Sequence, residues 1–264
     1  MDLGQQKCIN TFDDDFKTWH WTPGNLSFIL AGTSQGTATI LNWLGQKPHA
    51  EQEEIACALF LESVLGSGNS GIMHTVGMVP GATYLPFSRA WIPLAAKALH
   101  PHYKPWGMQA MESASNISPN IPVIIMHHVL DKQTCIDDAR RVYCQLKKTG
   151  NENVYLFEIE GTSARSWDTI RHIDVIDFDE NKNEKVRDIQ FIFQKHGIEV
   201  TRPKLEERDI SAYQPSIEEV EKRIAANSGR KNFIRNIIDC SAGIALVAGV
   251  SYLAKQYFTQ RCFA

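Results

Sequence analysis

The chain has 264 residues, 43% hydrophobic and 22% charged, a composition typical of a globular protein and not of a disordered or collagen-like chain. A formal net charge of −3 gives no reason to expect nucleic acid as a partner. The six cysteines are scattered without a C-x-x-C pair, so we expect no metal site, no disulfide framework and no cofactor. Residues 1–16 are polar and acidic, unlike a secretory signal, and a cytoplasmic location is expected.

The N-terminal part predicts a strand, a glycine turn and a helix. Residues 26–31 form an apolar run that ends at Gly32, as in a strand buried on both faces, and residues 37–44 carry apolar side chains at helical spacing. A second strand-like run follows at 55–61. Buried strands that alternate with helices predict the α/β class, with a mainly parallel sheet flanked by helices.

The middle of the chain predicts a second unit of the same kind. Residues 77–120 are rich in prolines and aromatic residues, and we interpret them as a lid-like insertion. A buried strand is predicted at 121–126, a helix at 137–148 and another strand at 154–159. We therefore place one sheet domain at residues 1–174.

The C-terminal part differs in composition. Residues 175–236 are charged and predict a helical extension, and residues 237–264 predict an apolar helix. The fifteen residues 240–254 are uncharged, with basic residues on both sides, which is typical of membrane helices. As a helix they reach only about 22 Å, short of a hydrocarbon core of about 30 Å. We favour a buried or partner-packing helix, and the alternative is a membrane anchor over residues 237–258.

The sequence G-x-S-x-G at residues 32–36 lies between the first predicted strand and helix. A serine hydroxyl becomes an effective nucleophile only when a tight turn holds it within reach of a base, and glycines allow such a turn. The pattern makes Ser34 a candidate nucleophile. The amide of Gln35, at the start of the helix, is a candidate oxyanion donor. The alternative is a small-residue turn with an incidental serine.

The segment from about residue 28 to residue 159 resembles the serine hydrolases of the α/β-hydrolase fold. Ser34 matches the position of the family's nucleophile, and residues 121–131 are similar to the strand that precedes the family's catalytic acid. The resemblance therefore implies that Asp131 is the acid. It also implies an acyl-serine route for the cleavage of esters or amides, with a small-molecule ester or a peptide as substrate.

The family's histidine normally follows the last core strand, but residues 160–167 contain none. The first histidine after them is His172, our candidate base, although residues 168–174 equally indicate an exposed helix start. His127 and His128 follow the acid-bearing strand, where a histidine more often packs or bonds locally.

The part of the chain before the motif is short for this family. Only 33 residues precede Ser34, and they contain no His-Gly dipeptide of the kind that supplies a second oxyanion donor. We therefore expect an N-terminally shortened α/β-hydrolase-like fold. The function predicted is that of a serine hydrolase, and the alternative is an inactive hydrolase-fold protein that acts by binding. The sequence does not indicate an oligomeric state.

Overall fold

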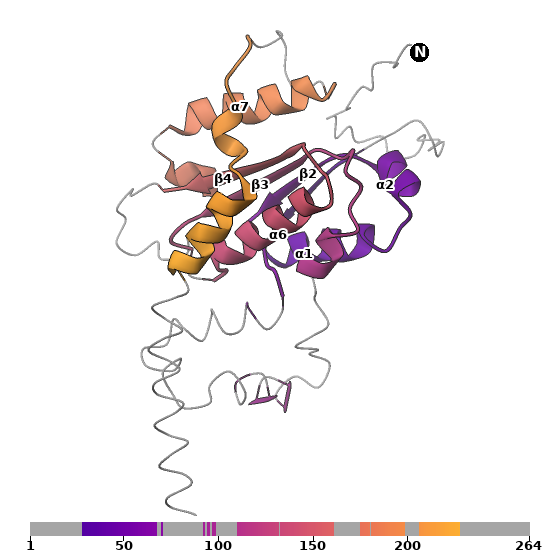
Figure 1. Ribbon diagram of the computed structural model, residues 1–264, viewed down its shortest axis with the longest axis vertical. Helices are drawn as coiled ribbons and strands as arrows, with labels where there is room; N and C mark the ends of the chain where they lie inside the picture. The colour runs from indigo at the N-terminus through magenta and orange to yellow at the C-terminus, as the bar shows by residue number, and fades with distance from the viewer. Residues whose placement is uncertain are drawn as a thin grey trace, which may run out of the picture.

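A computed structural model describes residues 28–67, 70, 92, 94–95, 97–98, 110–131, 133–160, 175–179, 181–198 and 206–227. Four strands form one sheet in the order β1-β2-β3-β4 (Figure 1). They are β1 (Phe28–Thr33), β2 (Ala56–Glu62), β3 (Val123–His128) and β4 (Val154–Ile159). Every neighbouring pair is parallel, so the carboxyl ends of all four strands lie at one edge. The predicted α/β class is confirmed.

The helices fall between and after these strands. In chain order they are α1 (Gln35–Leu44), α2 (His49–Ile55), α5 (Ala110–Ala114), α6 (Ile136–Lys148), the 3-10 turn η2 (Val175–Phe178), α7 (Lys182–Lys195) and the 3-10 turn η3 (Ser211–Tyr213). Residues 217–227 are also helical. A strand, helix and parallel strand recur along the chain, which is the connection that a parallel sheet requires.

The helices α1, α5 and α6 cover one face of the sheet. Alternate strand residues point to this face, because side chains in a strand have a period of two. The core between sheet and helices contains Leu59, Leu61, Val123, Ile125, Val154 and Leu156 from the strands, with Ala38, Leu41, Leu44, Ala139, Val142 and Leu146 from α1 and α6. Val220, from the helix at 217–227, joins the same core.

The helix α7 covers the opposite face, as Figure 1 shows. The second core combines Ile124, Met126, Tyr155, Phe157 and Ile159 with Val175, Ile189, Ile192, Phe193, Ile198 and Ile210. The predicted sheet domain ends at residue 174, and this second core includes residues beyond that point, from Val175 to Ile210. The few apolar residues of α7 lie at helical spacing among charges, and this spacing gives the helix one apolar face.

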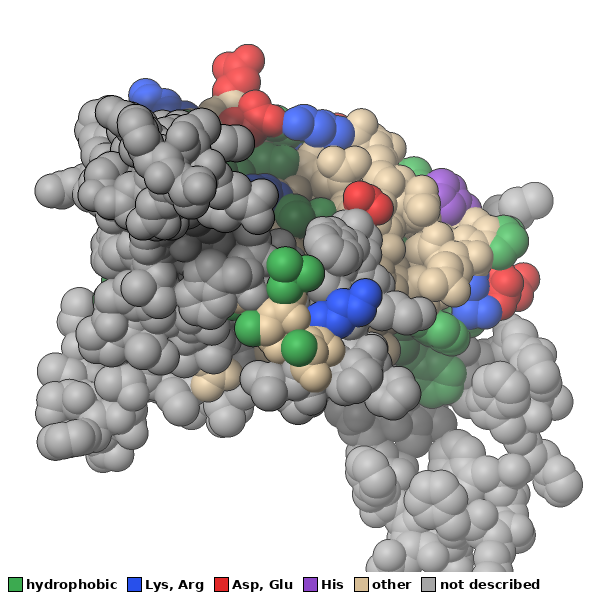
Figure 2. Space-filling model, turned by 90° about the horizontal axis from the view of Figure 1, so that it is seen from below, with side chains coloured by type: hydrophobic (Ala, Val, Ile, Leu, Met, Phe, Trp, Pro, Cys, Tyr) green, Lys and Arg blue, Asp and Glu red, His purple; other side chains and the backbone are tan. Residues whose placement is uncertain are grey.

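Parts of the predicted organisation lie outside the described residues. These include the C-terminal segment 237–264 and most of the lid-like insertion, of which α5 is described. Across the described ranges, no helix is both long and apolar enough to cross a membrane. On the described part of the face in Figure 2, basic, acidic and apolar side chains are interspersed.

Two arginines and two carboxylates join α6 and β4 to the helix at residues 217–227. Arg140 donates to Glu158 Oε1 at 2.7 Å and to Asp137 Oδ1 at 3.0 Å. Arg223 donates to Glu158 Oε2 at 3.0 Å. Burial alone would raise the pKa of Glu158, but the two guanidinium groups lower it below its usual value of 4.5.

We expect Glu158→Gln to reduce the loss of stability in acid. Because the folded-state pKa of Glu158 is lowered, its charge stabilises the fold above pH 4.5, and this contribution disappears as the pH falls through the lowered value. Urea unfolding at several pH values between about 6 and about 3 measures the effect. The variant should cost about 1–3 kcal/mol at pH 6 and show a shallower acid slope.

Glu152→Gln is the matched control, because the Glu152 side chain is 83% exposed. It should retain the acid slope of the unmodified protein, since an exposed ion pair contributes little. An unchanged slope in Glu158→Gln would contradict the role given to this network.

Candidate active site

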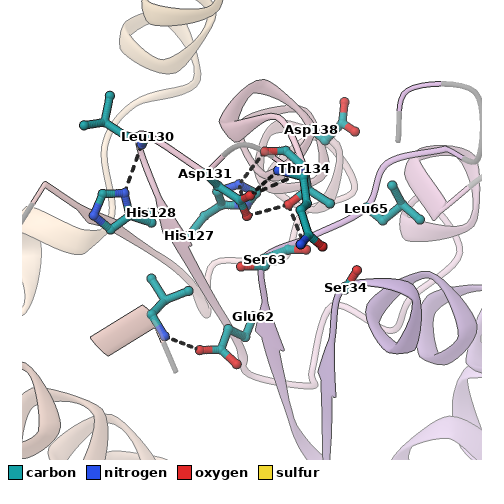
Figure 3. Close-up of polar contacts among 12 residues, drawn as sticks. Ser34, Glu62, Ser63, Leu65, His127, His128, Leu130, Asp131, Thr134 and Asp138 are labelled. Carbon is teal, nitrogen blue, oxygen red and sulfur yellow. Dashed lines mark hydrogen bonds and ion pairs between the residues drawn. The ribbon is translucent and has the colours of Figure 1, made fainter. Parts of the chain in front are cut away.

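Ser34 lies between β1 and α1, at the carboxyl edge of the sheet (Figure 3). Its backbone angles are φ 55° and ψ −118°, a sparsely populated combination for a residue other than glycine. The Ser34 amide still donates to the carbonyl of Glu62 at 3.0 Å, so the strand ladder continues up to this residue. The chain therefore turns abruptly from strand to helix at the serine itself.

Ser34 occupies the N-cap of α1 without acting as a cap. A serine at this position commonly accepts a hydrogen bond from the first helical turn, but Ser34 makes no side-chain cap. Thr37 holds the turn instead: its hydroxyl donates to the Ser34 carbonyl at 2.6 Å and accepts from the Leu65 amide at 3.1 Å. Among the described residues, none is hydrogen-bonded to Ser34 Oγ.

The glycine before the serine is required by packing. A Cβ added to Gly32 would lie 2.7 Å from Ile40 Cδ1 and 2.8 Å from the carbonyl carbon of Gly36. Gly36 itself has no neighbour within 4 Å of an added Cβ, apart from the backbone of its own helix. The close approach of strand to helix thus depends on Gly32 and not on the second glycine of the motif.

The predicted oxyanion donor, Gln35, is the first residue of α1 and has an exposed side chain. The first amides of a helix have no partner within the helix, and they carry the positive end of its dipole. The Gln35 amide is thus placed directly after Ser34, where an amide can stabilise negative charge on an oxygen.

Asp131, the predicted acid, is buried in the turn that follows β3. Its Oδ1 accepts from the amides of Gln133 at 2.7 Å and Thr134 at 3.1 Å, and its Oδ2 accepts from the Thr134 hydroxyl at 2.7 Å. His127 Nε2 lies 3.6 Å from Oδ2. The carboxylate therefore shapes this turn and pairs with a histidine of the preceding strand.

The two histidines at the end of β3 are buried and bonded locally. His128 Nδ1 accepts from the amide of Leu130 at 3.0 Å, so its proton is on Nε2 when the ring is neutral. His127 Nε2 lies 3.4 Å from the carbonyl of Thr134. The candidate base His172 lies outside the described residues. Ser34 and Asp131 are at the same sheet edge, and no hydrogen bond joins them.

Two residues at the end of β2 are not predicted from the sequence: Glu62, the last residue of the strand, and Ser63, which follows it. Glu62 is 9% exposed and accepts from the Thr33 hydroxyl at 2.9 Å. Ser63 is fully buried with a φ of 49°, and its Oγ has no hydrogen-bond partner among the described residues. A glutamate that closes an apolar strand was an available signal for Glu62. Nothing local distinguishes Ser63.

The described residues hold no cluster of three or more His, Cys, Asp or Glu side chains that could bind a metal ion.

Solved structures similar to this chain include a peptidase and a lipase. Acylaminoacyl peptidase of Pyrococcus horikoshii matches 70% of this chain and 26% of its own, with 14% identity and a TM-score of 0.44. Monoacylglycerol lipase of Paleococcus ferrophilus matches 63% of this chain and 67% of its own, with 15% identity and a TM-score of 0.36. The chain thus spans about a quarter of the peptidase.

The fold resembles that of the α/β-hydrolases. The all-parallel strand order and the G-x-S-x-G turn after β1 carry this resemblance. No family model matches the chain. No curated protein matches it either.

The two motif glycines should respond differently to alanine. Gly32→Ala forces a methyl group against Gly36 backbone and should destabilise the fold by about 1–3 kcal/mol. Gly36→Ala should be neutral or stabilising by about 0.5–1 kcal/mol, because the site is open and lies within α1. Urea unfolding of both variants measures the difference. Equal effects of the two substitutions would contradict the packing account of the turn.

Proposed function

We propose that this protein is a serine hydrolase that cleaves ester or amide bonds through an acyl-serine intermediate formed on Ser34. The observation that carries the proposal is the strained, uncapped serine at the carboxyl edge of a parallel sheet. A backbone in a costly conformation persists only where its surroundings enforce it, and such residues cluster at active sites. A serine needed only to cap α1 would accept a hydrogen bond from the helix.

In the proposed reaction, Ser34 Oγ attacks the carbonyl carbon of the substrate while its proton passes to the base. The Gln35 amide stabilises the oxyanion of the tetrahedral intermediate. Collapse of this intermediate breaks the ester or amide bond, the base returns the proton to the leaving group, and the acyl group stays on Ser34. Water, activated by the same base, then releases the acid and restores the serine.

We propose His172 as the base and Asp131 as the acid that orients it. Within its own turn Asp131 accepts from the amides of Gln133 and Thr134 and from the Thr134 hydroxyl. His127 Nε2 lies 3.6 Å from Oδ2 of the same carboxylate. A base oriented by Asp131 must therefore share this carboxylate with His127.

A fluorophosphonate probe tests the nucleophile, because it phosphonylates activated serines. The full chain should be labelled, and Ser34→Ala should abolish the labelling because the attacking oxygen is gone. Ser211→Ala is the matched control, since Ser211 is an exposed serine in η3, and it should be labelled like the unmodified chain. A folded protein that is not labelled would contradict the hydrolase proposal and favour the non-catalytic alternative.

Replacement of histidines tests the base. His172→Ala should slow labelling by about 10²-fold or more, because a general base contributes about 10²–10⁴-fold. His49→Ala is the control, since His49 is exposed at the start of α2. The rate should rise with pH as the base loses its proton, and His172→Ala should remove this dependence. Labelling of His172→Ala at the unmodified rate would exclude this residue as the base.

A further inference from the structure

We propose that Glu62 is a positioning residue for Ser34. Glu62 holds the end of β1 by accepting a hydrogen bond from the Thr33 hydroxyl. This inference rests on the proposed function of Ser34. Thr33 lies within the G-x-S-x-G motif and Glu62 lies outside it, and neither side chain takes part in the proposed reaction itself. Their role concerns the backbone conformation that presents Ser34 Oγ to a substrate.

The contacts between β1 and β2 carry the first step. Thr33 and Glu62 are partners in the parallel register, and the Ser34 amide donates to the Glu62 carbonyl at 3.0 Å. The Thr33 hydroxyl donates to Glu62 Oε2 at 2.9 Å. The residue before the serine is thus bound to Glu62 by its side chain, and the serine itself by its backbone.

The second carboxylate oxygen of Glu62 bonds a residue of the core on the α7 face of the sheet. Glu62 Oε1 accepts from the amide of Val175 at 2.7 Å (Figure 3). Val175 begins η2 and is fully buried, in the same core as residues of α7. This packing restricts the position of the Val175 amide, and the hydrogen bond from that amide restricts the position of the Glu62 carboxylate. The carboxylate in turn restricts the position of Thr33 through the hydrogen bond from its hydroxyl.

The turn at Ser34 needs support on both of its sides. On the helix side, the Thr37 hydroxyl bonds the Ser34 carbonyl and the Leu65 amide. On the strand side, the hydrogen bond from the Thr33 hydroxyl to Glu62 supports the end of β1. Residues 62–65, at the end of β2, therefore brace both sides of the strained serine.

The structure suggests Thr33 as the better residue to vary. Glu62→Gln could still accept from the Val175 amide and donate to the Thr33 oxygen, because a hydroxyl accepts as well as donates. Thr33→Val removes the hydroxyl with little change of shape, and Thr33→Ser keeps it. Thr39→Val is the matched control, because Thr39 is exposed and its hydroxyl donates to the carbonyl of Gln35, within α1.

The test compares the limiting rate of fluorophosphonate labelling at saturating probe. Thr33→Val should lower this rate by about tenfold or more, since small misplacements of a reacting group are costly. Thr33→Ser and Thr39→Val should stay within about twofold of the unmodified chain. A loss of folding is recognised by thermal unfolding of each variant, and a purely structural role would lower the midpoint without changing the rate in folded protein.

Hydrogen exchange provides a readout that does not need activity. Amides of residues 33–37 should exchange faster in Thr33→Val than in Thr33→Ser, while those of α6 stay unchanged. Unchanged exchange at 33–37, or labelling by Thr33→Val as fast as by Thr33→Ser, would overturn the inference. If the unmodified chain is not labelled at all, the proposed function fails, and the exchange experiment alone still decides the role of Thr33 and Glu62.

Discussion

The left-handed backbone at Ser34 is the constraint on which the arrangement of this protein depends. A serine adopts φ 55° only at a cost, so neighbouring groups must exclude the relaxed alternatives. Gly32 allows strand and helix to approach until an added Cβ would lie 2.8 Å from Gly36 backbone. Thr37 satisfies the carbonyl that the abrupt turn exposes. The hydroxyl of Ser34 is thereby left at the sheet edge instead of being used as a helix cap.

The layered fold supplies the rigidity for this turn. With helices on both faces, the interior strands β2 and β3 are buried, and their carboxyl ends cannot shift independently. The edge where β1, β2 and β3 end therefore forms a fixed frame for polar groups. The loop after β2 is tied to this frame as well, since the Gly66 amide donates to Asp138 Oδ2 at 3.1 Å.

Three buried or half-buried carboxylates are stabilised by different kinds of partner, because burial of a charged group is costly. The charge of Glu158 is paired with two arginines, whereas Asp131 accepts hydrogen bonds from the amides and the hydroxyl of its own turn. Glu62 accepts one hydroxyl and one backbone amide from segments far apart in the chain. A buried carboxylate without such donors would be very costly, so each set of partners explains why the charge is tolerated. Glu158 joins α6, β4 and the helix at 217–227, whereas Glu62 and Asp131 lie at the ends of β2 and β3, near the candidate site.

The sequence by itself determined the local features. The apolar runs and the helical spacing after Gly32 predicted the parallel sheet, and the G-x-S-x-G pattern predicted the turn at Ser34, because these patterns depend on near neighbours. The placement of α7 depended on tertiary structure, since its apolar face is interrupted by charges. The bond from Val175 to Glu62 joins residues 113 positions apart. No periodicity encodes a contact of this kind, because only the packed sheet brings its partners together.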